Sequence, residues 1–213
     1  AETEKYLDRW GFRRAFPTAE ALFLSIGRKC YDAWENYHEN IRIGDAVDIA
    51  AISGWETTAI ENHSGIVDNL RHFKADPEIV RRSLAAVRPC AKQRRLVYDV
   101  GEAAVVDLYL FNDTNRPVPG ELTLTLIAPN GRKTTIATVR AAPFERDVFS
   151  TLLDEGVTLP PFDAPGEWRV HFAADAQPGA AFERRFWVVA PAPRPARPPP
   201  ASSAHRSTRL TPC

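Results

Sequence analysis

The C-terminal half of the chain is a series of short segments rich in Val, Leu, Phe and Thr, separated by turn residues. About seven such segments follow one another over roughly 100 residues, which is the spacing of strands in a β-sandwich. They cover residues 92–98, 104–111, 121–127, 133–139, 146–152, 167–173 and 182–189. Leu122, Leu124 and Leu126 alternate with threonines, as in an antiparallel strand with one buried face. Asn130 and Gly131 form a strong hairpin-turn signal.

This pattern predicts an immunoglobulin-like β-sandwich over residues 89–190. A disulfide-pinned domain of the antibody type is excluded, because these segments hold no cysteine pair. The three cysteines (Cys30, Cys90 and Cys213) are widely spaced and form neither a metal signature nor a disulfide framework. They leave the compartment open, with a bacterial periplasmic or extracellular location expected over a cytoplasmic one.

A long amphipathic helix is predicted before the sandwich. Thr18 is a good N-cap residue, and Glu20 lies in the first turn, where a negative charge is favoured. Gly44 stands where a helix commonly ends. Between them, apolar residues recur every three or four positions: Leu22, Ile26, Cys30, Ala33 or Trp34, Tyr37 and Ile41. We expect this face to be buried, with the cysteine acting as a small hydrophobic residue.

Residues 47–52 form a short run that is apolar except for Asp48. Such a run is typical of a strand that is covered on both faces, as in parallel α/β sheets. Asp76, Pro77 and Glu78 then give a cap, a proline at the first helical position and an acid in the first turn, which predicts a helix over residues 77–86. Helix, strand, loop and helix make one and a half units of an α/β repeat, which is too little to close a sheet.

The two ends of the chain carry different information. From residue 191 onward Pro, Arg, Ala and Ser dominate, and a segment of this composition cannot bury a core, so we predict a disordered tail over residues 191–213. The chain has no methionine. We therefore expect it to be a processed or trimmed piece of a longer protein.

Composition argues against several partners. The chain has 27 basic and 27 acidic residues, so no overall field favours nucleic acid or an anionic membrane. No apolar run approaches the roughly 20 residues that cross a bilayer. One basic run spans the domain junction, but it lacks interleaved aromatic residues and is interpreted as a solvated surface: Arg81, Arg82, Arg88, Lys92, Arg94 and Arg95. The five histidines show no ligand spacing, so we expect no metal and no cofactor.

A turn-rich loop over residues 52–68 follows the predicted strand and carries the candidate site. Its residues of interest are Trp55, Glu56, Glu61, Asn62 and His63. The C-terminal end of a strand is where α/β scaffolds present their sites. An indole ring can bind the apolar C–H face of a sugar, and the polar side chains can bind its hydroxyl groups. In the alternative interpretation, Trp55 caps a core and the two glutamates are solvated. A third possibility is that Glu56 and Glu61 form an acid pair of their own.

The order of these elements resembles the end of a glycoside hydrolase of clan A, most like family 2, the β-galactosidase and β-mannosidase group. In that family a TIM barrel is followed by an immunoglobulin-like sandwich, and the last barrel strand ends in a tryptophan at the sugar pocket. The resemblance makes residues 18–43 helix seven, residues 49–56 strand eight with its mouth, and residues 77–86 helix eight. It assigns residues 1–88 to the barrel and implies a carbohydrate substrate, bound by Trp55, Glu56, Asn62 and His63.

Catalytic residues cannot be assigned from this resemblance. A retaining glycosidase needs two carboxyl groups about 5 Å apart. In the family these groups follow barrel strands four and seven, and neither motif occurs in this chain. We therefore expect the chain to be inactive alone, with the missing N-terminal part of the same protein as its partner. The alternative is a non-catalytic sandwich with a helical extension that binds carbohydrate or protein.

Overall fold

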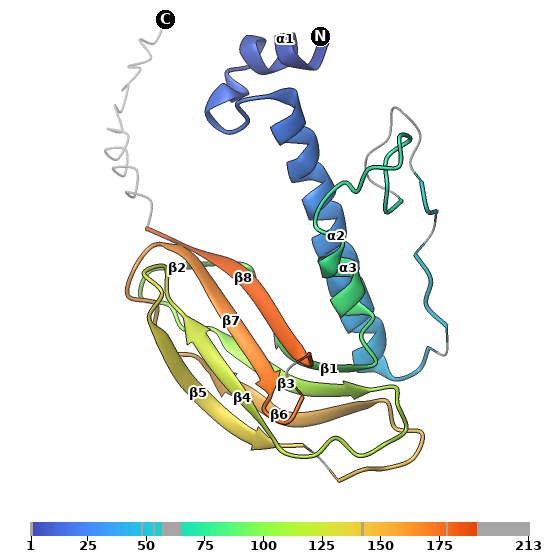
Figure 1. Ribbon diagram of the computed structural model, residues 1–213. Coiled ribbons are helices and arrows are strands. Elements are labelled where there is room, and N and C mark those ends of the chain that lie inside the picture. Colours follow the sequence, from blue (N-terminus) through green and yellow to red (C-terminus); the bar gives the residue numbers. More distant parts are fainter. Residues whose placement is uncertain are drawn as a thin grey trace, which may run out of the picture.

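The computed structural model describes residues 2–47, 49–52, 54–56, 65–141, 143–177 and 179–190. Figure 1 shows a long helix, α2 (Ala19–Gly44), with the short helix α3 (Glu78–Ser83) beside it and a β-sandwich at its C-terminal end. The predicted tail over residues 191–213 lies outside the described residues, as do Glu61, Asn62 and His63.

The sandwich consists of one three-stranded and one five-stranded sheet. The smaller sheet has the order β1 (Val87–Gln93), β3 (Val105–Asn112) and β6 (Ser150–Thr158). The larger sheet has the order β2 (Val97–Asp99), β8 (Ala181–Val189), β7 (Gly166–Ala174), β4 (Glu121–Ile127) and β5 (Lys133–Arg140). The two-sheet arrangement agrees with the predicted β-sandwich, while an immunoglobulin-like topology stays a prediction.

The hairpin between β4 and β5 is confirmed at the predicted turn. Gly131 has a φ of 83°, which a glycine adopts without strain, and the Ala128 amide donates to the Arg132 carbonyl at 2.9 Å. The leucines of β4 are buried, as their alternation predicts. An aromatic cluster fills the core between the sheets, with ring centroids 5.2–5.5 Å apart: Tyr98, Phe162, Trp168 and Phe186.

Two predicted strands differ from the structure. A single strand over residues 92–98 is wrong, because β1 and β2 belong to different sheets and residues 94–96 connect them. Leu96 already follows β8 in the larger sheet, since its carbonyl accepts from the Trp187 amide at 2.9 Å. The strand predicted over residues 146–152 lies further along the chain, as β6. Its second half was missed because Asp154 and Glu155 interrupt the apolar pattern expected of a strand.

The helix α2 is confirmed, but the burial predicted for its apolar face is wrong. Thr18 caps the helix by accepting from the Ala21 amide at 3.1 Å. On the predicted apolar face, Ile26 is 40% and Tyr37 is 59% exposed, and Cys30 is half-buried. The buried residues of the helix instead lie on a neighbouring, more polar face: Gly27, Tyr31, Glu35, His38 and Glu39. Packing follows the polar face because its two carboxylates find arginine partners on the sandwich.

The strand predicted over residues 47–52 is also wrong. The described residues on either side of position 48 form no strand, and Val47 and Ile49 are 53% and 85% exposed. A strand needs a hydrogen-bonded neighbour, and all the strands that the structure describes pair within the sandwich. The predicted second helix is present as the shorter α3. The interpretation of residues 1–88 as the end of a TIM barrel stays a prediction.

A further helix, α1 (Glu2–Arg9), has no counterpart among the predicted elements. Leu7 is the single buried residue of this helix, so its sequence lacks the apolar repeat every three or four residues by which a helix is predicted. It is held by Arg13, which donates to both Asp8 carboxylate oxygens at 2.7 and 2.9 Å and also pairs with Glu4. The second carboxylate oxygen of Glu4 accepts from the Ala19 amide at 2.8 Å, at the start of α2.

Candidate functional site

Trp55 and Glu56 lie next to each other on an exposed loop beside α2. The Trp55 carbonyl accepts from the amides of Ile66 and Val67 at 2.9 and 3.0 Å. Trp55 as a whole is 55% exposed. The Glu56 carboxylate pairs with Arg71, with 3.0 Å between Oε2 and Nε. Two of the four predicted sugar-binding residues are thus placed on the surface together, while Asn62 and His63 fall outside the described residues.

This loop is anchored to α2 by one close backbone approach and one buried phenol. A Cβ atom on Gly27 would lie 2.3 Å from the Lys74 carbonyl oxygen, so only glycine permits this contact. Tyr31 is fully buried, donates its hydroxyl to the Ile66 carbonyl and stacks on Trp34 at 5.8 Å. Burial raises the pKa of Tyr31, which keeps its hydroxyl protonated as a donor.

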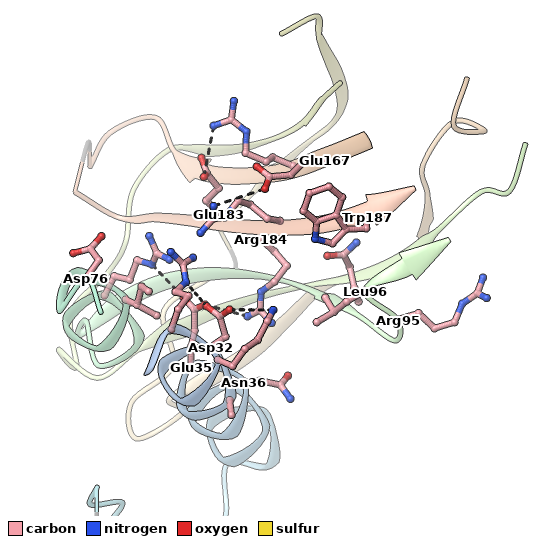
Figure 2. A pocket seen from close by; sticks show the side chains of 18 of the residues that line it. Asp32, Glu35, Asn36, Asp76, Arg95, Leu96, Glu167, Glu183, Arg184 and Trp187 are labelled. Atoms are coloured by element: carbon pink, nitrogen blue, oxygen red, sulfur yellow. Dashed lines mark hydrogen bonds and ion pairs between the residues drawn. The ribbon is translucent and has the colours of Figure 1, made fainter. Parts of the chain in front are cut away.

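A groove of about 830 Å³ lies between α2, α3 and the outer side of the β7–β8 hairpin. Figure 2 shows Asp32, Glu35 and Asn36 on the helix at one side and Glu183 and Trp187 on the strands at the other. Gln93 at the end of β1 and residues 94–96, which connect the two sheets, also line the groove. The volume lies within the range of about 300–1,000 Å³ that is usual for ligand sites.

A buried ion-pair cluster lies beside this groove and joins α2 to both sheets. We use this name for Glu35 and Glu39 of α2, Arg88 of β1 and Arg184 of β8. Nη2 of Arg88 donates to Glu35 at 3.0 Å and to Glu39 at 2.9 Å, and Arg184 also donates to Glu39. Three of the four side chains are at most 4% exposed, and that of Arg184 is 12% exposed. The cluster therefore fixes the helix against the open edge of the sandwich.

The cluster and its surroundings hold more positive than negative side chains. Arg82 approaches Glu35 at 3.2 Å and Lys92 approaches Glu39 at 3.9 Å, so four cations surround two carboxylates. Burial alone would lower the pKa of Arg184, but the charges of Glu39 and Glu35 raise it above its usual value. Burial lowers the pKa of Lys92, which is only partly offset by Glu39.

His38 and Ser83 form a second polar contact between the helices. The Ser83 hydroxyl donates to the Val80 carbonyl at 2.7 Å, so it accepts from Nδ1 of His38 at 2.9 Å. Burial lowers the pKa of His38, and the charges of Arg88 and Arg42 lower it further, so the imidazole is neutral. Ser83 is fully buried and cannot reach a substrate, which makes this pair structural rather than catalytic.

The two buried glutamates of α2 are not suited to hydrolysis. Glu35 and Glu39 are 3% and 1% exposed and are neutralised by arginines, so they cannot serve as an acid and a nucleophile. Within the described ranges, no group of three or more His, Cys, Asp and Glu side chains is arranged to hold a metal ion. None of the described helices combines the length and apolar character that a membrane span requires.

The cluster was not predicted, and one prediction about it is wrong. Arg88 belongs to the basic run that was interpreted as a solvated surface, yet it is 1% exposed. A signal was present in β8, where Arg184 alternates with the apolar residues Phe182 and Phe186 on one face. A cation at such an inward position requires a buried acid, and the like-charged pair Glu35 and Glu39, one helical turn apart, could have supplied it.

No family model matches the chain, and no curated protein matches it. Solved structures with a partial likeness include a β-glucosidase from Listeria innocua in complex with isofagomine, with 14% identity and a TM-score of 0.35 over 48% of this chain and 16% of that enzyme. A mutant of this enzyme with laminaribiose matches at 11% identity and a TM-score of 0.36, over 68% and 20% of the two chains.

A third neighbour is the alkylpurine DNA glycosylase of Pseudomonas fluorescens bound to DNA with an abasic site analog, at 15% identity and a TM-score of 0.32 over 49% and 30% of the two chains. The chain thus spans less than a third of the length of each of these three proteins. The neighbours include glycoside hydrolases, but the likeness is too weak to carry an argument about function.

Proposed function

We propose that this chain is the C-terminal part of a longer glycoside hydrolase that cleaves the O-glycosidic bonds of β-linked sugars. In this proposal residues 1–88 belong to the end of a TIM barrel, and residues 49–56 would form its last strand only beside the barrel strands that precede this chain. Residues 89–190 form an immunoglobulin-like sandwich. The loop with Trp55, Glu56, Asn62 and His63 forms one wall of the sugar pocket. The catalytic carboxylates come from the preceding part of the same protein.

The observation that carries this proposal is the exposed apolar face of α2. Phe23, Ile26 and Tyr37 are 47%, 40% and 59% exposed, and the run after the helix exposes Val47 and Ile49. Burying one such side chain fully stabilises a protein by about 1.5–3 kcal/mol. A contiguous exposed apolar surface marks a site of interaction. A helix from a TIM barrel would expose such an apolar face when the barrel elements that normally cover it belong to another part of the protein.

The exposed ring of Trp55 supports a role in sugar binding. It is 55% exposed, and it forms no ring stacking or cation–π contact with the described residues. The side chain of the neighbouring Glu56 is 37% exposed and pairs with Arg71. An aromatic face next to a hydrogen-bonding carboxylate suits the apolar and hydroxyl-bearing faces of a sugar ring.

The proposal is tested by comparing the 213-residue chain with the same chain extended by the residues encoded upstream. We expect no hydrolysis of aryl β-glycosides by the chain alone and measurable turnover by the extended protein. In the extended protein, Trp55→Ala should lower kcat/KM at least about tenfold, which corresponds to about 1.4 kcal/mol of transition-state binding. Turnover by the 213-residue chain, or an inactive extended protein, would overturn the proposal.

A non-catalytic binding module is the second candidate. The observation that favours it is the groove beside α2, which is formed entirely by described residues and needs no other part of a protein. This candidate predicts ligand binding by the 213-residue chain itself, whatever the extended protein does.

A further inference from the structure

We propose that the groove between α2, α3 and the β7–β8 hairpin binds an acidic oligosaccharide, a chain of sugars that carry carboxylate groups. This site is separate from the loop with Trp55, and it does not depend on the glycosidase proposal. The reasons are the charge of its walls, the arrangement of its arginines and an exposed indole ring.

The walls of the groove are positively charged. Eight arginine and lysine side chains line it against five carboxylates. The carboxylates are already engaged within the protein: Glu183 lies 3.7 Å from Arg169, Glu167 lies 3.7 Å from Arg185, and Asp76 accepts from the Glu78 amide at 3.0 Å. The surplus is therefore cationic and favours an anionic ligand.

Two of the arginines line the groove from neighbouring strands. Arg169 and Arg185 are direct partners in the register of β7 and β8, so like charges face each other across the strands. Glu183 and Glu167 partly balance these charges, and both arginine side chains are 41% exposed, so a carboxylate in the groove can accept from their remaining donors. Arg94 is exposed and forms no ion pair with the described residues. Donors for more than one carboxylate are thus available.

An indole ring distinguishes a sugar from a simple anion or an acidic peptide. Trp187 lies on the outer face of β8 and is 52% exposed, and Leu96, which is 47% exposed, also lines the groove. Figure 2 shows these two side chains and Arg184 among the residues that line the groove. Apolar surface for the C–H face of a sugar and guanidinium groups for its carboxylates occur together in one groove.

The inference is tested by calorimetry on the 213-residue chain at physiological salt, with trigalacturonate as the probe. We expect saturable binding that weakens as salt is raised, because ionic contacts at the surface are screened. Trp187→Ala and Arg94→Gln should each weaken binding about fivefold to tenfold, which is the effect of losing one ring contact or one charged hydrogen bond. Neutral cellotriose and a poly-glutamate peptide should bind at least about tenfold more weakly than trigalacturonate.

Two matched controls lie outside the groove. Arg140→Gln removes the same charge from β5, at the far edge of the larger sheet, and Trp10→Ala removes another exposed indole, which lies outside both the groove and the loop with Trp55. Both should bind trigalacturonate as the unsubstituted chain does. Absence of binding, equal affinity for the neutral or the peptide probe, or equal losses in the controls would overturn the inference. None of these results depends on glycosidase activity, so failure here and failure of the proposed function can be told apart.

Discussion

Replacing Arg88 by methionine tests whether the buried ion-pair cluster holds α2 on the sandwich. Arg88 is 1% exposed, and its Nη2 donates to Glu35 at 3.0 Å and to Glu39 at 2.9 Å. Methionine has a similar length and can fill the space beside the ring of Phe182, over which the guanidinium lies at 5.6 Å. The substitution therefore removes charge while leaving most of the volume filled.

The expected loss of free energy for docking α2 on the sandwich follows from the contacts that Arg88→Met removes and from those that remain. A hydrogen bond to a charged group is worth about 1.5–3 kcal/mol, so the two bonds together set a scale of about 3–6 kcal/mol. Glu35 keeps Arg82 at 3.2 Å, and Glu39 keeps Arg184, so neither carboxylate is left unpaired. We therefore expect the low end, about 3 kcal/mol, which corresponds to a factor of about 100 in the docking equilibrium.

Hydrogen exchange can locate this loss, because only α2 depends on the cluster for docking. In Arg88→Met, the amides of α2 should exchange about 100-fold faster, while those of β4 and β7 should be unchanged because they share the apolar core of the sandwich. Arg140→Met, at an exposed position on β5, should change neither. An effect below about 1 kcal/mol, or equal acceleration in β4 and β7, would refute the reasoning.

Three further predictions follow from single residues. Gly27→Ala should destabilise the chain by about 1–3 kcal/mol in urea titrations, because its Cβ would lie 2.3 Å from the Lys74 carbonyl, whereas Gly44→Ala in the same helix should not, since nothing lies within 4 Å. Burial holds the pKa of His38 below 6.5, so the unfolded chain binds more protons; the free energy of unfolding should fall as the pH drops below about 6.5, and less so in His38→Gln. Tyr37 is 59% exposed, so Tyr37→Ser should leave the melting temperature of the isolated chain within about 2 °C of the unsubstituted value and should reduce binding of a hydrophobic dye. A large loss of stability would show that the apolar face of α2 is already packed.

Most strands of the sandwich could be predicted because their alternation follows from burial of one face. The leucines of β4 and the turn at Asn130 and Gly131 are local signals, and the structure places both as expected. The boundary between β1 and β2 could not be predicted in this way. A crossing from one sheet to the other depends on the partner strands, which lie elsewhere in the sequence.

The helical part was harder to predict, because its packing depends on charge pairing over long distances. The spacing of apolar residues located α2 correctly but indicated the wrong buried face. The choice of face depends on Arg88 and Arg184, which lie 49 and 145 positions from Glu39. The apolar run over residues 47–52 resembled a strand in sequence, but a strand forms only beside a partner, and the described part of the chain offers none there.

The most direct test of the central claim is to measure whether the exposed face of α2 becomes covered in the longer protein. Hydroxyl-radical footprinting would compare the oxidation of Ile26 and Tyr37 in the 213-residue chain and in the protein extended upstream, with Trp187 on the sandwich as the internal reference. If this face packs against the rest of a glycosidase, oxidation of both residues should fall at least about fivefold in the extended protein while that of Trp187 stays unchanged. Equal oxidation of Ile26 and Tyr37 in the two proteins would contradict the account.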